Sequence, residues 1–197
     1  MNIKKFVKGG KRKMNRLIYK ILKKRKEKQY LKYIENHKDN VVDAFYDLVM
    51  CPDMDWFDWE PIHVDLYERI LKHDDSKYLV EEFDAYRKQY YPVNEEEKIL
   101  NAEAFEKAWE HHWKNNRHHW QARSFDICEN DKLSKEQILD CLENVLDWMA
   151  MGYAFNDRPY QFYEKNKNEI RLPKAQEEFI EKIIYEGIDK QYIKRGV

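Results

Sequence analysis

Six of the seven histidines in the chain fall into three short groups. Four lie in the segment His111–His119, another pair of candidate ligands is the adjacent His73 and Asp74, and His63 precedes that pair. Only His37 falls outside these groups. Imidazole and carboxylate groups together favour Mn, Fe, Ni or Zn over Ca or Mg. The clustering therefore predicts a metal centre with one or two divalent transition-metal ions, and a hydrolytic enzyme as its most direct use.

The spacing inside the segment limits how it can bind an ion. His111 and His118 are seven residues apart, as are His112 and His119. Two turns of straight helix rise by about 10.5 Å, which is too far for ligand bonds of about 2.1 Å to one ion. Either a helix ends at Asn115-Asn116 or the two pairs have different roles. We expect the helix to end there, with one histidine of each pair binding and its neighbour packing or donating a hydrogen bond.

Asp147 lies in an otherwise apolar stretch, Val145 to Met151. A carboxylate buried in such a stretch is costly unless it has a partner. A metal ion would supply that partner, which makes Asp147 a further candidate ligand. A salt bridge within the helix is the alternative.

Three residues are candidates for roles in catalysis. Asp74 is placed to bind the metal, and Lys77 is placed to meet a phosphate oxygen as a point charge. Glu82 is a candidate general base. The competing interpretation of the whole set is a group of histidines on the polar surface of a helix.

Helices are expected to position all of these residues, because 5 Gly and 5 Pro in 197 residues favour long helices over a turn-rich β fold. Apolar spacing near 3.6 predicts a helix from Met14 to Ile34, and we expect Asp39-Asn40 to break it before the next helix. This predicts an all-α fold with a basic N-terminal arm or helix at 1–38 and a helical metal-binding domain at 39–197. The remaining helices are expected at 62–71, 81–91, 95–113, 134–155, 159–168 and 173–188.

Charge is distributed unevenly. Residues 1–30 hold ten Lys and three Arg against a single acid, Glu27, a net charge of +12 in a chain whose total is -1. Such a segment suits an anionic partner such as nucleic acid or a membrane surface, although a solvated helix face has the same composition. The three cysteines form no CxxC pair, which indicates reduced thiols and a cytoplasmic protein. No apolar run reaches the length of about 20 residues that a membrane span needs.

Several segments together resemble an uncharacterised family of small bacterial and phage proteins, a domain of unknown function. The resemblance extends over roughly residues 60–172 and leaves the basic N-terminal segment outside. The segments that carry it are His73–Lys77, Glu82–Tyr86, His111–Trp120, Asp147–Met151 and Tyr163–Lys167.

That family is similar in turn to the HD-domain superfamily, helical metal-dependent phosphohydrolases named for an adjacent His-Asp. The superfamily's ligand order is His, His-Asp, His, His, Asp. The resemblance implies an HD-like helical bundle in which His63, His73, Asp74 and Asp147 hold one ion. A second ion would be held by one histidine from each later pair, with Asp74 bridging, and the substrate would be a nucleotide or another small phosphoester.

Two other functions remain open at this stage. The HD fold also contains an iron oxygenase, so the fold alone does not fix the reaction. The chain is alternatively a non-catalytic interaction protein, with structural histidines and a basic arm that binds nucleic acid or a membrane.

Overall fold

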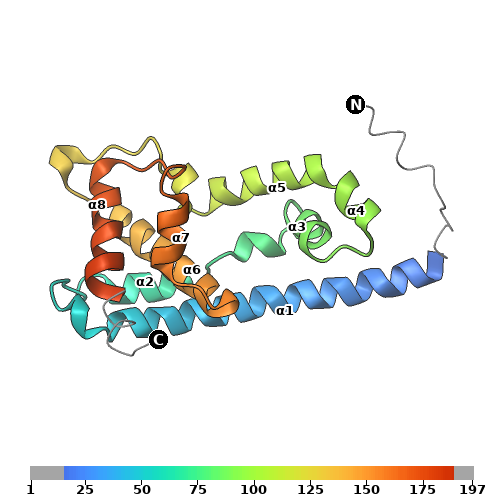
Figure 1. Ribbon diagram of the computed structural model, residues 1–197, viewed down its shortest axis with the longest axis horizontal. Coiled ribbons are helices and arrows are strands. Elements are labelled where there is room, and N and C mark those ends of the chain that lie inside the picture. Colours follow the sequence, from blue (N-terminus) through green and yellow to red (C-terminus); the bar gives the residue numbers. More distant parts are fainter. Residues whose placement is uncertain (1–15, 189–197) are drawn as a thin grey trace.

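The computed structural model describes residues 16–188, and these residues form helices and loops without a strand (Figure 1). The prediction of an all-α fold is confirmed. The frame of the fold is α1 (Arg16–Val49), a helix of 34 residues. Figure 1 shows α3, α4 and α5 beside its N-terminal half, and α2, α6, α7 and α8 gathered around its C-terminal half.

The predicted break at Asp39-Asn40 is wrong, because α1 continues through both residues and across the expected domain boundary. Its buried side chains recur every three or four residues on both sides of that point, so one face remains packed along its length. Asn40 also donates a hydrogen bond from Nδ2 to Ala150 O on α6 (3.3 Å). Tertiary packing therefore outweighs the weak helix propensity of Asp and Asn.

The other helices follow the predicted order with changed ends. They are α2 (His63–Ile70), α3 (Phe83–Tyr90), α4 (Glu95–Leu100), α5 (Ala102–Asn115), α6 (Lys135–Phe155), α7 (Pro159–Asn166) and α8 (Lys174–Lys182), with a π-helical turn at Ile183–Ile188. The single helix expected at 95–113 is two helices that meet at Asn101, whose Nδ2 donates to Ala85 O (2.7 Å). A capping box formed by Ser134 and Gln137 begins α6, at the start of the helix expected at 134–155.

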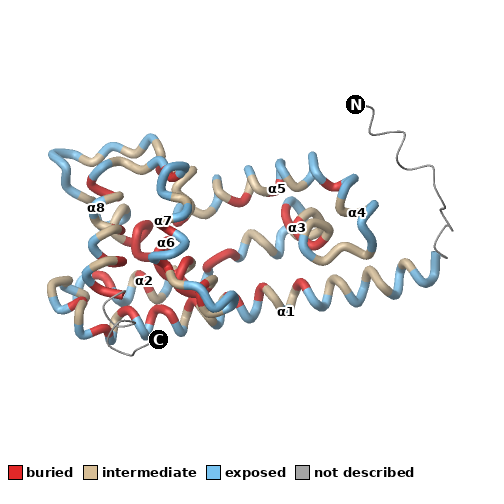
Figure 2. Tube along the Cα trace, in the orientation of Figure 1, coloured by how far each residue is buried: buried red, intermediate tan, exposed pale blue. Residues whose placement is uncertain are grey.

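The larger of two hydrophobic cores fills the end of the molecule where α1 finishes. Its aliphatic side chains come from α1, α2, α6 and the C-terminal helices, and α6 is buried on most sides (Figure 2). The aromatic loop at 51–61 covers this core, with Trp56 and Phe57 packed against Phe179. Cys51, Cys128 and Cys141 are free thiols.

The smaller core is aromatic and lies between α1, α3 and α5. Tyr30, Ile34, Tyr86 and Ala108 are its buried members. Beside it Arg87 is fully buried and is paired with Asp84 and Glu97, and Glu97 also accepts a hydrogen bond from Tyr19 Oη (2.8 Å). These contacts fix α3 and α4 against the first part of α1.

Within residues 16–188, no helix is both long enough and apolar enough to cross a membrane.

Candidate metal centre

The two cores meet at a cluster of buried histidines and carboxylates. His37 contributes from the middle of α1, between Ile34 of the smaller core and Val41 of the larger one. Its Nε2 lies 3.3 Å from His73 Nε2, and both nitrogens lie near the same two carboxylates. Asp147 on α6 places Oδ1 at 3.1 Å from His37 Nε2 and 3.6 Å from His73 Nε2. We call His37, His73, Asp74 and Asp147 the His37 group.

A second set of ligand atoms lies on the other side of Asp74. His112, in the last turn of α5, places Nε2 at 3.2 Å from Asp74 Oδ1, and His118 Nε2 lies 3.7 Å from the same oxygen. With His119, these residues each offer a ligand atom within 4.8 Å of the others. We call Asp74, His112, His118 and His119 the His118 group.

Asp74 is the residue that the two groups share. Its Oδ2 lies 3.4 Å from His37 Nε2, whereas its Oδ1 lies beside His112 and His118. The residue follows α2 in a left-handed backbone conformation (φ 59°), which aspartate and asparagine tolerate better than most residues. That conformation leads directly into a short 3-10 helix, η3 (Asp75–Tyr78), which carries Lys77.

The arrangement satisfies the donor-set requirements of a transition-metal site. Asp74 Oδ1, His118 Nε2 and His119 Nε2 are buried and have no hydrogen-bond partner among the described residues. Such atoms are costly to bury unless a ligand satisfies them. Three imidazoles and one carboxylate whose ligand atoms lie within 4.8 Å of one another suit Zn, Mn, Fe or Ni.

Two glutamates orient the histidines from behind. Glu143 on α6 places Oε1 at 2.8 Å from His73 Nδ1 and 3.2 Å from His118 Nδ1. Glu82 places its two oxygens at 2.7 Å from His111 Nδ1 and 2.8 Å from His112 Nδ1. A carboxylate hydrogen-bonded to Nδ1 fixes the proton there, so at His73 and His112 the lone pair on Nε2 is left for a metal.

The end of α5 explains how both histidine pairs reach one region. The helix stops at Asn115, and Asn116 is extended (φ -126°, ψ 96°). The side-chain amides of Asn115 and Asn116 donate to the carbonyls of His111 (2.8 Å) and His112 (2.7 Å), near the C-terminal end of the helix. The predicted end of the helix at Asn115-Asn116 is therefore confirmed.

Arg123 holds the loop that follows. It is fully buried, and its guanidinium donates to His118 O (3.0 Å), to Asn144 on α6 and to Gln176 on α8 (3.1 Å). These bonds tie the backbone at His118 to α6 and α8, two of the helices that form the larger core. The loop position of His118 is consequently set by the interior of the protein.

The two groups have different electrostatics. Burial lowers the pKa of His73, but the surrounding Asp74, Asp147 and Glu143 carboxylates outweigh it and raise that pKa to about 10. Burial also lowers the pKa of His37, but hydrogen bonds and charge from Asp147 and Asp74 outweigh burial, so the pKa of His37 is raised. Burial holds the pKa of His118 and His119 below the usual histidine value, and neighbouring histidines lower it further.

Burial raises the pKa of Asp74, yet Lys77, His73 and His112 outweigh burial and hold the pKa well below the usual value for aspartate. The pKa of Asp147 is likewise well below its usual value, because hydrogen bonds from His37 and His73 outweigh burial. Both carboxylates are therefore ionised at neutral pH and ready to bind a cation.

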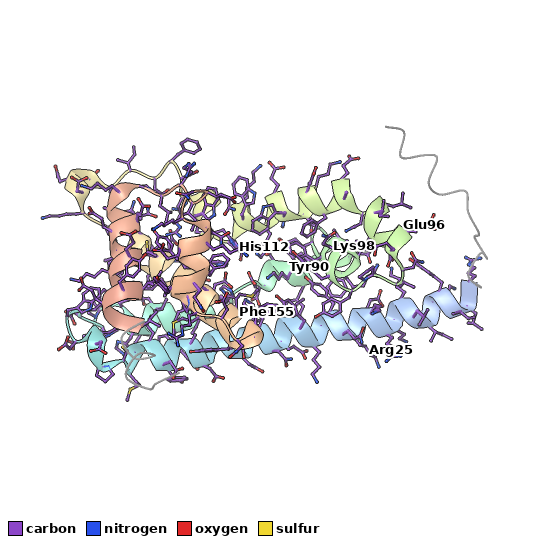
Figure 3. The ribbon with its side chains drawn as sticks, viewed as in Figure 1. Arg25, Tyr90, Glu96, Lys98, His112 and Phe155 are labelled. Carbon is purple, nitrogen blue, oxygen red and sulfur yellow. The ribbon has the colours of Figure 1, made fainter. Side chains whose placement is uncertain are left out.

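A cavity of about 810 Å³ opens beside the cluster, and Asp74, Lys77, His112, His119 and Asp147 lie on its wall. Figure 3 labels His112 with two aromatic side chains of the same wall, Tyr90 and Phe155. Lys77 is paired with Asp74 Oδ2. The candidate ligands are thus accessible to a small molecule from one side.

The structure changes the membership of the site predicted from sequence. His63 is exposed, places Nδ1 at 3.0 Å from Trp59 O, and belongs to none of the potential metal groups found among residues 16–188. His37, and not His63, lies beside His73, Asp74 and Asp147. His111 is partly exposed and contacts Glu82, which is the packing role expected of the histidine in a pair that does not bind the metal. In the other pair, His118 and His119 both face the cluster. Glu82, predicted as a general base, is fully buried behind the histidines.

His37 and Glu143 were missed, although the sequence contained a signal for each. His37 continues the buried stripe of Tyr30 and Ile34 at helical spacing. Glu143 precedes Asp147 by four residues, which places both carboxylates on one face of α6.

The comparisons with known proteins give a family but no function. The chain matches no curated protein and no solved structure. Residues 26–186 match a family of unknown function, DUF5662. The match begins well before the residue 60 expected from the sequence, and it includes most of α1 and His37. Because the match spans most of the sequence, the chain belongs to the DUF5662 family.

Proposed function

We propose that the His37 and His118 groups bind divalent transition-metal ions and that the protein is a metal-dependent phosphohydrolase. The observation that carries this proposal is the position of Asp74, whose two carboxylate oxygens face different sets of histidine nitrogens. A carboxylate with that environment is typical of sites that hold two ions about 3.5–4 Å apart.

The order of the candidate ligands also supports the proposal. With His37 in place of His63, the cluster follows the sequence His37, His73-Asp74, His112, His118 or His119, and Asp147. This is the order that the resemblance to HD-domain phosphohydrolases implies. The same order favours an HD-like arrangement of the helices.

Metal ions at this position would supply an activated water and neutralise phosphate oxygens. In the hydrolysis, a water oxygen bonds to phosphorus, the P–O bond to the alcohol breaks, and the alcohol leaves with a proton. Lys77 lies on the cavity wall beside Asp74, where its ammonium group attracts and orients the phosphate as a point charge. Glu82 and Glu143 keep the histidine Nε2 atoms directed at the ions.

Elemental analysis of the purified full chain tests the metal part of the proposal. We expect bound Mn, Fe, Ni or Zn in the wild-type protein and in a His63→Gln control, and loss of metal in His73→Gln. Protein that contains no transition metal and takes up none on titration would overturn the proposal.

A phosphatase panel with the metal that is found tests the reaction. Release of inorganic phosphate that disappears in both His73→Gln and Lys77→Ala supports a phosphohydrolase. A di-iron absorption spectrum with oxygen uptake, and no phosphate release, would instead identify an oxygenase.

A second candidate function, which does not exclude the first, is binding of an anionic macromolecule by the N-terminal segment. Residues 1–15 lie outside the described part of the chain. In the described part, Lys24, Arg25 and Lys28 are exposed on α1, and Figure 3 shows Arg25 on the side away from α3 and α4. We expect the protein to bind nucleic acid or anionic vesicles in a salt-dependent manner. Changing Lys24, Arg25 and Lys28 together to Glu should abolish this binding, whereas His73→Gln should leave it intact. Absence of binding at low salt would remove this candidate.

A further inference from the structure

The cavity beside the metal centre has an unusual wall for a phosphate site, because aromatic rings make up much of it. The rings begin at the candidate ligands themselves. Trp109 stacks on His112 with ring centroids 5.8 Å apart and meets the edge of His119 at 5.1 Å. Tyr86 meets His112 edge to face at 5.6 Å. A group bound next to the metal centre would therefore contact π faces immediately.

Further rings continue the wall outwards. Trp148 lies on the cavity wall with Tyr90 and Phe155, and the last two are 59% and 66% exposed. Tyr90 is the last residue of α3 and Phe155 is the last residue of α6. Planar rings stack favourably on such side chains whatever their hydrogen-bonding pattern. A large exposed Phe and Tyr at a cavity wall are costly in water unless a ligand covers them.

The charges on the wall set a limit on the number of phosphates. Among residues 16–188, the only Lys or Arg side chains on this wall are Lys77 and Arg158, and Lys77 is already paired with Asp74. Asp157 and Glu169 add negative charge away from the metal centre. One phosphate can be neutralised by bound metal ions and Lys77. Additional phosphates would lie near carboxylates without the row of cations that a polyphosphate requires.

The volume is consistent with a single small molecule. A cavity of about 810 Å³ lies within the usual range of about 300–1,000 Å³ for small-molecule sites. A polymer would need an open groove with basic side chains along it.

We infer that the substrate is a phosphate monoester whose alcohol carries a planar aromatic ring, and that polyphosphates and nucleic acid polymers are poor substrates. This inference rests on the proposed phosphohydrolase function. A nucleoside monophosphate and a simple aryl-alkyl phosphate share the required chemistry, and the experiment separates them.

The test compares matched phosphates with the metal-loaded full chain. A nucleoside 5′-monophosphate and ribose 5-phosphate differ in the nucleobase, and benzyl phosphate and methyl phosphate repeat that comparison without a nucleoside. We expect kcat/KM to be at least about 10-fold higher for the ring-bearing member of a pair, since one stacked ring contributes about 1–3 kcal/mol. The pair with the larger ratio shows whether the ring is a nucleobase. Equal kcat/KM within both pairs, or a nucleoside triphosphate as good as the monophosphate, would overturn the inference.

Variants on the cavity wall provide a second measurement. Tyr90→Ala and Phe155→Ala should raise KM for the ring-bearing phosphate about 10-fold, and should therefore lower the ratio of kcat/KM between that phosphate and ribose 5-phosphate by a similar factor. Phe125→Ala is the matched control, because Phe125 is 95% exposed and is not part of the wall. Glu169→Gln should raise kcat/KM for the nucleoside triphosphate several-fold relative to kcat/KM for the monophosphate. An effect of Phe125→Ala equal to that of Phe155→Ala would count against the inference.

Failure of the reaction can be distinguished from failure of the cavity assignment. Quenching of tryptophan fluorescence by the free nucleoside or benzyl alcohol measures ring binding without turnover. Quenching that Phe155→Ala weakens, in a protein that hydrolyses no phosphoester, would overturn the phosphohydrolase and retain the aromatic-ring site. Hydrolysis with no ring preference would overturn only the inference made here.

Discussion

The His37 group and the His118 group share Asp74 but are supported by different parts of the fold. The His37 group relies on α1 and α6, the two longest helices, which pack against each other through the larger core. The His118 group relies on the end of α5 and the loop after it, which Arg123 ties to the interior. Charge separates them further, since carboxylates raise the pKa of His37 and His73, whereas burial lowers that of His118 and His119.

This difference teaches that similar ligand sets need not have the same affinity or pH dependence. At neutral pH the metal-free His37 group holds protons that an ion must displace. His118 and His119 are neutral and have lone pairs available. The two long helices favour a fixed geometry in the His37 group. The neutral histidines favour easier metal binding in the His118 group. Four experiments test how far metal binding by the two groups is independent.

The largest effect is expected from Asp74→Asn, because Asp74 belongs to both groups. Asparagine tolerates the left-handed backbone at this position but removes the negative charge between the two sets of histidines. We expect metal affinity to fall by more than about 100-fold at both groups, beyond the effect of an outer residue. Isothermal titration with Zn²⁺ measures it, and circular dichroism checks the fold. Retention of one tight site would mean that Asp74 serves a single group.

Single ligand changes should separate the groups. His37→Gln is expected to remove the ion of the His37 group and keep the other, and His118→Gln is expected to do the reverse. Metal stoichiometry by elemental analysis would then fall by one ion in each variant. Loss of all metal from either variant would show that the groups load as one unit, and His63→Gln serves as the unchanged control.

Changes behind the ligands should have a smaller effect. Glu143→Gln touches both groups through His73 and His118, whereas Glu82→Gln touches only the His118 group through His112. Loss of such a partner typically costs about 10- to 100-fold in metal affinity. We therefore expect Glu143→Gln to weaken both sites and Glu82→Gln to weaken one. Equal effects on both sites from Glu82→Gln would contradict the division.

The smallest expected effect is on pH dependence. The raised pKa of His73, about 10, means that its proton is present in the metal-free protein at pH 7 and is lost as pH rises towards that value. Metal affinity of the His37 group, measured in His118→Gln, should therefore rise by up to about 10-fold between pH 7 and 8. The His118 group, measured in His37→Gln, should show a shallower slope, because His118 and His119 are already neutral. Equal slopes would contradict the assigned charges.

Features of the site that depend on neighbouring residues could be predicted from the sequence, and features that depend on contacts between distant segments could not. The end of α5 was predictable because two adjacent asparagines interrupt the helix locally and bind its last carbonyls. The continuity of α1 was not predictable from the sequence, because it depends on the packing of α1 against α6, which is distant in the sequence. His63 seemed to belong with His73 because they are close in sequence, but an exposed position at the start of α2 separates it from the cluster.

The sequence by itself determined the helical class, the clustering of histidines with Asp74, and the need for the His111–His119 segment to bend. Those features depend on composition and on the pitch of a helix, which act over a few residues. Only the tertiary structure decided that His37 joins the cluster, that Glu82 and Glu143 lie behind the histidines, and that an aromatic cavity opens beside them. Each of these depends on which helix faces meet, and the burial of two cores decides that over the whole chain.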